Sequence, residues 1–241
     1  MRLEFDIGNT NHKWRLLDGG QVVRRGSFAN NSDGLNDVPQ LGVSEIWAAC
    51  VANARYVEAL AQWASTFGIE VQQAVVTQQA SGVVCAYPEP HRLGVDRWLA
   101  VLAAYYRYGP SCVIDIGSAM TVDAVDENGI HLGGYIVPGY QLLLNSLFKD
   151  TDKVRWAESE INGDLSLAKD TGNAVVAGVK LMLVGFVEQA IARLPFDNAQ
   201  VVFTGGGGRI LREACDDRGV WLEDLVFEGL ALAAREPVKL V

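Results

Sequence analysis

The sequence predicts an α/β protein made of two similar halves, and three observations support this prediction. The chain has 241 residues, a length that fits two domains of ordinary size. Short apolar runs typical of strands alternate with segments of helical period along the chain. An apolar run followed by Asp, any residue, Gly and a nearby hydroxyl occurs twice, at Asp6 and at Asp115. We therefore expect one domain over residues 1–111 and a similar one over residues 112–241.

The first half begins with a strand–turn–strand pattern. Leu3, Phe5 and Ile7 alternate with polar residues, and Gly8 opens a turn that leads to a second apolar run from Trp14. The next expected elements are a strand over 21–28, a buried strand over 46–51, an amphipathic helix over 55–67 that ends at Gly68, and a strand with Val71, Val75 and Val76. This mixture is what an α/β domain requires.

The second half repeats the mixture with a longer helix. After an extended stretch that contains Pro88 and Pro90, we expect a helix from Asp96 onward. The remaining elements are expected as strands over 113–116, 120–125 and 131–137, a helix over 142–148, a loop over 151–170, a long apolar helix over 174–194, a strand over 200–203, a helix over 209–215 and a final helix through 221–234. Glycines at 133, 134 and 139 flank the strand over 131–137, so another backbone can approach it closely.

The turn after Asp6 has the chemistry of a phosphate site. Backbone amides, the Asn9 amide and the Thr10 hydroxyl donate hydrogen bonds there, and Lys13 adds a point charge. Asp6 would repel phosphate directly, so we expect it to hold a hydrated cation such as Mg²⁺ beside one. The alternative is a hairpin with a polar turn, which the second such turn at Asp115 disfavours.

Two Asp-x-Gly turns in one chain resemble the acetate kinase, sugar kinase, Hsp70 and actin superfamily. The resemblance implies two ribonuclease H-like α/β domains of the actin/hexokinase type, with ATP bound in the cleft between them. A glycine turn after the strand over 200–203 occupies the next position in the superfamily's order, so Gly205 and Gly206 are expected to contact the nucleotide. The alternative for these glycines is a flexible turn before a helix.

Composition limits the classes of partner. The net charge of −9 disfavours nucleic acid and anionic membranes. The four cysteines are scattered without a Cys-x-x-Cys pair, which is typical of reduced thiols in the cytosol. No apolar run reaches the roughly 18 residues needed to span a bilayer, and Asp6 and Asn9 lie where a signal peptide would be apolar. We therefore expect a cytoplasmic protein that binds neither nucleic acid nor membrane.

Asp96 and Thr171 each allow a structural and a binding interpretation. Asp96 begins an expected helix, where it either caps the helix or, with Arg97, binds an anionic substrate that carries a hydroxyl. Thr171 precedes the long apolar helix and is either a helix-start residue or a ligand contact. That helix is apolar on most faces, which predicts burial against a partner or the other domain.

The full set of motifs resembles the type III pantothenate kinase family, which includes proteins named Bvg accessory factor. The set comprises Asp-Ile-Gly-Asn-Thr at 6–10, Leu-Gly-Val-Asp-Arg-Trp at 93–98, Asp-Ile-Gly-Ser at 115–118, Gly-Gly-Tyr-Ile-Val-Pro-Gly at 133–139 and Thr-Gly-Gly at 204–206. These motifs occur in the family's order and cover essentially the whole chain. The resemblance implies a homodimer that phosphorylates pantothenate with ATP to give 4′-phosphopantothenate, the first step of coenzyme A biosynthesis.

The resemblance also implies roles for individual residues. The family's ATP-contacting positions match Asp6, Ile7, Gly8, Asn9, Thr10, Asn11, His12, Lys13 and Ser118. Its pantothenate-contacting positions match Tyr87, Gly94, Val95, Asp96, Arg97 and, from the second subunit, Thr171. Asp96 matches the proton acceptor, and Asp115 matches the ligand of a monovalent cation, K⁺ or NH₄⁺. Mg²⁺ is expected at Asp6 through water.

The chain departs from the family's pattern at two positions. Ser118 stands where the family usually has Thr, and the hydroxyl is kept. Asp170 stands where the family often has Asn, and its carboxylate would have to point away from an anionic substrate. Two other functions stay open: another small-molecule kinase of the superfamily, and a nucleotide-binding accessory protein without catalysis. The presence of both Asp6 and Asp96 disfavours the second.

Overall fold

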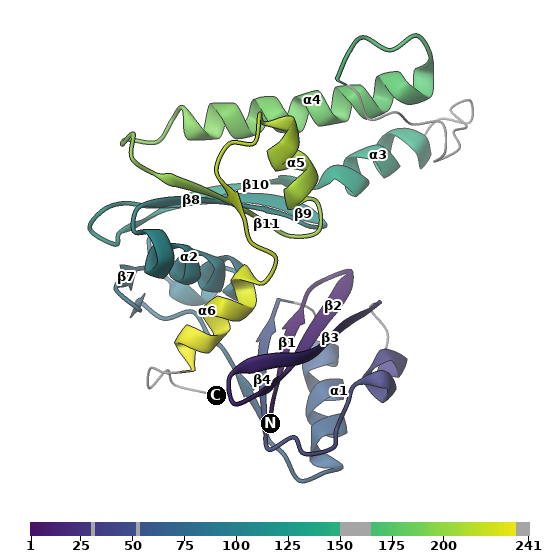
Figure 1. Cartoon of the computed structure of the whole chain (residues 1–241), viewed down its shortest axis with the longest axis vertical. Helices are drawn as coiled ribbons and strands as arrows, with labels where there is room; N and C mark the ends of the chain where they lie inside the picture. The colour runs from purple at the N-terminus through teal and green to yellow at the C-terminus, as the bar shows by residue number, and fades with distance from the viewer. Residues whose placement is uncertain (30–31, 52–53, 150–164, 235–241) are drawn as a thin grey trace. The chain divides into compact units, whose positions relative to one another are not determined.

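The computed structural model describes residues 1–29, 32–51, 54–149 and 165–234 (Figure 1). The chain divides into two compact units: Met1–Arg107 together with the segment from Asp224 onward, and Tyr108–Glu223. Each unit contains a five-stranded mixed sheet, which confirms the predicted α/β class and the internal similarity. The sequence-based boundary between residues 111 and 112 stays a prediction, and it lies close to the division after Arg107.

The first sheet has the strand order β3-β2-β1-β4-β5. Its strands are β1 (Arg2–Ile7), β2 (Asn11–Asp18), β3 (Gln21–Ala29), β4 (Glu45–Cys50) and β5 (Val71–Gln73), followed in the chain by the short hairpin of β6 (Gln79–Ala80) and β7 (Val83–Val84). The first three strands are antiparallel, while β4 and β5 run parallel to β1. The 3₁₀ helix η1 (Ser32–Asp37) and α1 (Ala54–Ser65) cover one face, where Phe5, Leu35 and Leu60 share a core. Gly68 follows α1 with φ +75°, as predicted for a helix-ending glycine.

Two further helices complete the first unit: α2 (Val95–Tyr108), which the 3₁₀ helix η2 (Pro90–Arg92) precedes, and α6 (Leu225–Ala233). Gly229 of α6 packs against the backbone of Leu99 in α2 so closely that a Cβ atom would collide with it. Arg15 of β2 joins α6 to the sheet: Nη2 donates to the Phe227 carbonyl at 3.0 Å, and Nε donates to the buried Glu4 at 2.7 Å. The C-terminal helix therefore belongs to the first sheet.

The second sheet repeats the first in the order β10-β9-β8-β11-β12. Its strands are β8 (Ser111–Ile116), β9 (Ala119–Val125), β10 (His131–Pro138), β11 (Gln200–Thr204) and β12 (Val220–Trp221). The directions match those of the first sheet, with β11 and β12 parallel to β8. Figure 1 shows α3 (Tyr140–Lys149), α4 (Thr171–Ile191) and α5 (Gly208–Ala214) beside this sheet, and Leu144, Val187 and Leu211 pack into one core with Ile114 and Phe203.

Most predicted elements are confirmed, two differ from the structure, and one is not tested. β5 stops at Gln73, so Val75 and Val76 lie outside it. Val220 and Trp221 form a parallel edge strand beside Val202 and Phe203 instead of beginning the final helix. The expected loop over 151–170 lies mostly outside the described residues.

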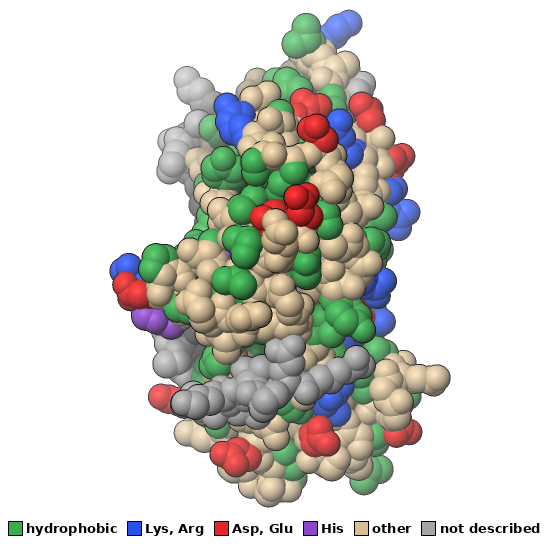
Figure 2. Space-filling view, turned by 90° about the vertical axis from the view of Figure 1, so that its left-hand side faces the viewer, with side chains coloured by type: hydrophobic (Ala, Val, Ile, Leu, Met, Phe, Trp, Pro, Cys, Tyr) green, Lys and Arg blue, Asp and Glu red, His purple; other side chains and the backbone are tan. Residues whose placement is uncertain are grey.

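Figure 2 shows acidic side chains dispersed over one face of the molecule among apolar and polar ones.

Candidate active site

The internal repeat places the two predicted aspartates at equivalent positions. Asp6 is the penultimate residue of β1, and Asp115 is the penultimate residue of β8. Each strand lies between an antiparallel and a parallel neighbour. Asp6 pairs in register with Lys13 on β2, whereas Asp115 pairs with Thr121 on β9. Both carboxylates therefore stand at the ends of strands, beside the turns that the sequence motifs predicted.

The environment of Asp6 fits a cation site. Burial raises the pKa of Asp6 to about 6 from its ordinary value of 3.8; the charge of Lys13 opposes this shift, and that of Asp96 adds to it. Asp6 and Asp96 are thus near enough for their charges to repel each other. A bound cation would relieve this repulsion, and a carboxylate oxygen is a ligand that Mg²⁺ prefers.

The turn between β1 and β2 is tight and exposed. A Cβ atom on Gly8 would stand 2.9 Å from the Asn11 carbonyl, so a larger residue would distort the turn. Asn9, Thr10 and Asn11 are exposed, and Lys13 is partly buried. The predicted phosphate donors are therefore accessible, while the side chain of Ile7 faces the core.

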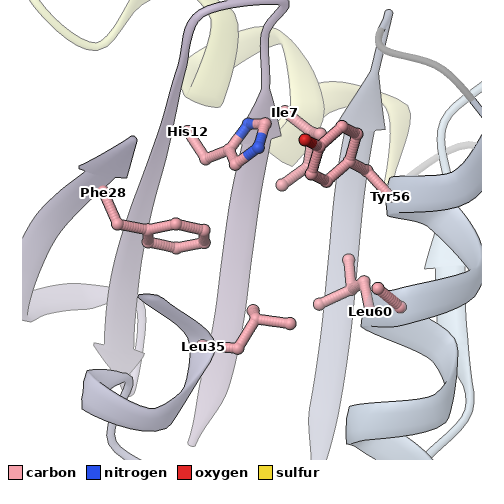
Figure 3. A pocket seen from close by; sticks show the side chains of 7 residues that line it. Ile7, His12, Phe28, Leu35, Tyr56 and Leu60 are labelled. Atoms are coloured by element: carbon pink, nitrogen blue, oxygen red, sulfur yellow. The ribbon is translucent and has the colours of Figure 1, made fainter. Parts of the chain in front are cut away.

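His12 has a different environment from its neighbours in this turn. Its side chain is fully buried, with its ring centroid 5.2 Å from that of Phe28 and 5.1 Å from that of Tyr56. Figure 3 shows these rings around a small pocket that Ile7 and Leu60 also line. The predicted contact of His12 with ATP is compatible with this burial only through its backbone.

Asp96 and Arg97 begin α2 and are held by local hydrogen bonds. Asp96 Oδ1 accepts a hydrogen bond from the Arg97 backbone N–H at 2.7 Å, so the carboxylate contributes to capping the helix. Arg97 is 7% exposed, and its Nη1 donates to the Tyr87 hydroxyl at 3.3 Å. A Cβ atom on Gly94 would stand 2.6 Å from Asp96 Oδ1, which explains the glycine. Three of the predicted pantothenate contacts therefore form one connected group.

In the second unit, two glycine turns pack closely against Asp115 and the turn that follows it. Gly205, with φ +78°, packs directly against the Asp115 carboxylate and the Ile116 carbonyl. Gly139 packs with equal closeness against the turn formed by Gly117 and Ser118, to which it is also hydrogen-bonded. The close approach expected at residue 139 is thus confirmed. The backbone of Gly205 lies against the carboxylate and that of Gly139 against the adjoining turn, an arrangement suited to a cation and a phosphate chain.

Thr171 is exposed at the first position of α4, and Asp170 is the N-cap residue. The Asp170 carboxylate accepts hydrogen bonds from the backbone N–H and the side-chain amide of Asn173, each at 2.9 Å. These bonds lower the pKa of Asp170. The helix-start role considered for Thr171 therefore belongs to Asp170, and this extra carboxylate is committed to the helix.

The structure also shows a pocket that sequence reasoning missed. Tyr87, Pro88, Glu89 and Arg92 line a hollow of about 330 Å³. Tyr87 was predicted from its motif, but Glu89 and Arg92 had no motif to mark them.

Among the described residues, no group of three or more His, Cys, Asp or Glu side chains gathers as a metal site. A cation at Asp6 or Asp115 would thus also need oxygens from phosphate, backbone or water.

Comparison with protein families gives a consistent result over most of the chain. The model of a family described as type III pantothenate kinase matches residues 2–193. A type III pantothenate kinase of Alcanivorax borkumensis is 38% identical over 247 residues, which cover 98% of this chain and 100% of that protein. One from Pseudomonas aeruginosa PAO1 is 34% identical and covers 97% and 98% of the two chains.

Solved structures with low sequence identity share the fold. A putative Baf family transcriptional activator from Campylobacter jejuni has a TM-score of 0.64 at 22% identity, covering 97% of both chains. An activator of 2-hydroxyisocaproyl-CoA dehydratase from Clostridium difficile, solved with bound ADPNP, has a TM-score of 0.56 at 13% identity, covering 97% and 94%. The actin-like MreB 5 of Spiroplasma citri, solved with AMPPNP, has a TM-score of 0.50 at 9% identity, covering 97% and 96%. The fold is thus of the actin/hexokinase type.

Proposed function

Because this chain belongs to the type III pantothenate kinase family, we propose that it transfers the γ-phosphoryl group of ATP to pantothenate with Asp96 as the proton acceptor. The product, 4′-phosphopantothenate, enters coenzyme A biosynthesis. The observation that carries the assignment of roles is that the charge of Asp96 reaches Asp6 and adds to the raised pKa of its carboxyl. This places a carboxylate of the phosphate-binding turn close to a carboxylate of the substrate segment.

The proton acceptor must reach the primary hydroxyl of pantothenate. Phosphoryl transfer in kinases depends mostly on positioning the hydroxyl in line with the phosphate and on stabilising charge. Asp96 takes up the hydroxyl proton late in this transfer, so it need not be a strong base. Its hydrogen bond from the Arg97 N–H fixes the direction of the carboxylate. Capping and catalysis are therefore compatible roles for one side chain.

Asp6 and Lys13 serve the phosphate end of the reaction. Mg²⁺, when bound, neutralises part of the charge on the β- and γ-phosphates. Asp6 would bind the Mg²⁺ ion through one of its water ligands. Lys13, which pairs with Asp6 in register, would add a positive charge. Gly8, Asn9, Thr10 and Asn11 would donate hydrogen bonds to phosphate oxygens. Ile7 and His12 would support this turn from the core side.

The second unit supplies the other ATP contacts and the monovalent cation site. Asp115 would bind K⁺ or NH₄⁺, and its charge would then be matched without a neighbouring Lys or Arg on β9. Ser118 would contact the phosphates, and Gly205 and Gly206 would lie against the nucleotide. Each unit would thus supply part of the ATP contacts that the family resemblance implied.

Pantothenate would be held by the segment before and at the start of α2. Tyr87 and Arg97 are already hydrogen-bonded to each other, and Gly94 and Val95 shape the turn that presents Asp96. Thr171, which is exposed and not used as a cap, would contact pantothenate from the second subunit. This arrangement requires a homodimer.

Exposed apolar side chains on α3 and α4 support the homodimer. Leu142 and Leu147 are 53% and 47% exposed, and Leu181 and Met182 are 58% and 50% exposed. By length and composition α4 could cross a membrane, and 39% of that segment is buried inside the protein. Burial of α4 against this sheet and against a second subunit accounts for its apolar character in a cytoplasmic kinase.

One assay tests the proposed function. Purified protein is incubated with ATP, Mg²⁺, K⁺ and pantothenate, and 4′-phosphopantothenate is detected by mass. Product that requires all four components supports the proposal. Bound ATP without product would favour a nucleotide-binding accessory protein, and product only from another alcohol would favour a different kinase activity.

A further inference from the structure

A pocket of about 330 Å³ lies beside Tyr87, at the edge of the segment that carries Asp96. Its lining combines the Tyr87 ring with Pro88, Glu89 and Arg92. Pockets that bind small molecules usually measure about 300–1,000 Å³. The volume therefore suits part or all of a small substrate.

We propose that Arg92 is a specificity-determining residue that binds the carboxylate of pantothenate in this pocket. The inference rests on the proposed kinase function and adds the end of the substrate that Asp96 does not touch. Pantothenate carries its reacting hydroxyl at one end and a carboxylate at the other. The group that recognises the carboxylate must therefore lie away from Asp96 but on a connected surface.

Tyr87 provides that connection. Its hydroxyl accepts a hydrogen bond from Arg97 Nη1 at 3.3 Å, and Arg97 follows Asp96 directly. The same Tyr87 side chain lines the pocket with Arg92. A substrate whose hydroxyl lies at Asp96 can thus extend past Tyr87 toward Arg92.

The charge pattern in the pocket favours Arg92 as the anion-binding group. Arg97 is buried and occupied with Tyr87, whereas the Arg92 side chain is 68% exposed. The nearest charge to Arg92 is Glu89, at 3.7 Å, which is too long for a hydrogen bond. Such an exposed pair is weak. A substrate carboxylate could form two parallel hydrogen bonds with the guanidinium and would compete well.

Glu89 can turn away when the substrate binds, because a second side chain lies within reach of its carboxylate. His91 Nε2 lies 3.4 Å from the other Glu89 carboxylate oxygen. The backbone that carries these side chains is fixed: the Arg92 N–H donates to the Glu89 carbonyl at 3.0 Å, and the buried Leu93 donates to the Pro90 carbonyl at 3.0 Å. Arg92 is therefore an exposed charge on a hydrogen-bonded turn. The negative charge of Glu89 weakens the attraction of Arg92 for anions.

Steady-state kinetics on four variants test the proposal. Arg92→Gln should raise KM for pantothenate about tenfold, as expected for loss of one charge-assisted contact, with kcat and KM for ATP unchanged. Arg92→Lys should restore part of the affinity, and Glu89→Gln should lower KM. Arg209→Gln is the matched control, because Arg209 is also exposed and paired with a Glu on its own element but lies in the other unit. Added choline chloride at constant K⁺ should raise KM more in the native protein than in Arg92→Gln.

Equilibrium binding of pantothenate, in the presence of a non-hydrolysable ATP analogue, separates this inference from the proposed function. If the native protein binds pantothenate but makes no product, the kinase function fails, and Arg92→Gln is still tested by its Kd. A KM and Kd for Arg92→Gln within twofold of the native values would overturn the role of Arg92. An equal rise in Arg209→Gln would also overturn it. Absence of pantothenate binding to the native protein would overturn both proposals.

Discussion

The first sheet places a positive charge opposite its acidic residue, whereas the second sheet places a hydroxyl there. Lys13 pairs with Asp6 across β1 and β2, and Thr121 pairs with Asp115 across β8 and β9. The two sheets have the same strand order and directions, so this difference is one of side-chain chemistry alone. The first site thus has a positive charge on the neighbouring strand, whereas the second has a hydroxyl, and we propose that a cation from solution binds there.

The difference continues along the same pair of strands. Arg15 on β2 forms a buried ion pair with Glu4 at 2.7 Å. The equivalent position on β9 is Asp123, which lies 3.0 Å from His131, and both are at most 2% exposed. Each sheet thus buries a pair of potentially charged side chains, but the first pair joins β1 to β2 and the second joins β9 to β10, so β2 carries the base and the equivalent strand β9 the acid. The same position of this sheet can therefore hold a buried acid or a buried base, provided that its partner lies beside it.

The largest effect is expected in the first unit, at the proposed proton acceptor Asp96. Asp96→Asn keeps the size of the side chain and its capping ability, since Asn and Asp cap helices about equally well. General-base contributions are typically about 10²–10⁴-fold, so turnover should fall by that factor while ATP still binds. Turnover and thermal stability should be measured on the same sample. A nearly unchanged rate in folded protein would contradict the catalytic role of Asp96. Its carboxylate would then serve only to accept the hydrogen bond from the Arg97 N–H.

Acid titration of Asp6 is the next test. Because its pKa is raised to about 6, Asp6 loses its charge as pH falls through that value. We expect kcat/KM for ATP to fall about tenfold per pH unit below pH 6. In Asp6→Asn, kcat/KM should be much lower at every pH and should no longer show this fall. A pH profile that stays flat down to pH 5 would contradict this role for Asp6.

The same shift has a consequence for stability with the opposite sign. A carboxyl with a raised pKa stabilises the fold when it is protonated, and that stabilisation is lost as pH rises from 3.8 through about 6. Asp6→Asn should therefore increase the unfolding free energy of the ligand-free protein at pH 7.5, by at most about 3 kcal/mol. Denaturant unfolding at pH 7.5 and pH 4 measures this difference, which should be smaller at pH 4.

Exchanging chemistry between the units gives a smaller but more specific effect. Activity should fall several-fold when Na⁺ replaces K⁺, and Asp115→Asn should weaken the response to K⁺. Thr121→Lys would give the second site the cross-strand charge of the first, so its rate should depend less on the cation. The ratio of rates in K⁺ and Na⁺ is the readout, with Thr121→Ser as the control that keeps the hydroxyl. Equal rates in both salts for the native enzyme would refute a cation at Asp115.

The smallest effect is expected at His12. The equivalent position in the second sheet is Met120, which is fully buried. If His12 only packs between Phe28 and Tyr56, His12→Met should change stability by less than about 1.5 kcal/mol and leave KM for ATP unchanged. A large rise in KM for ATP with an unchanged melting temperature would instead show that the imidazole acts on the nucleotide.

Local patterns predicted what depends on local geometry. Strand alternation, the two Asp-x-Gly turns and the helix from Asp96 were visible because each depends on neighbouring residues. The same two-residue period could have revealed His12, which alternates in step with Trp14 and Leu16 and shares their core face. The alternation indicates a core position for His12, whereas the motif indicates a contact with ATP.

Contacts between distant segments could not be predicted in this way. α6 joins the first sheet through Arg15 and Phe227, which are far apart in the chain. The pocket beside Arg92 depends on where Tyr87 points, and no spacing rule fixes that direction. Val220 and Trp221 form a strand because they pair in parallel with β11 at the edge of the sheet. This pairing exists only once the sheet has assembled.

The return of α6 to the first sheet has a consequence for synthesis on the ribosome. The second unit is one continuous stretch, Tyr108–Glu223, and all of its strands have been made when Glu223 is added. The first unit begins earlier, but the bond from Arg15 to the Phe227 carbonyl cannot form until α6 emerges. Domains usually fold during translation in chain order. Here the unit that is started first would be finished last, so a nascent chain released before Leu225 would hold a complete second sheet and an incomplete first one.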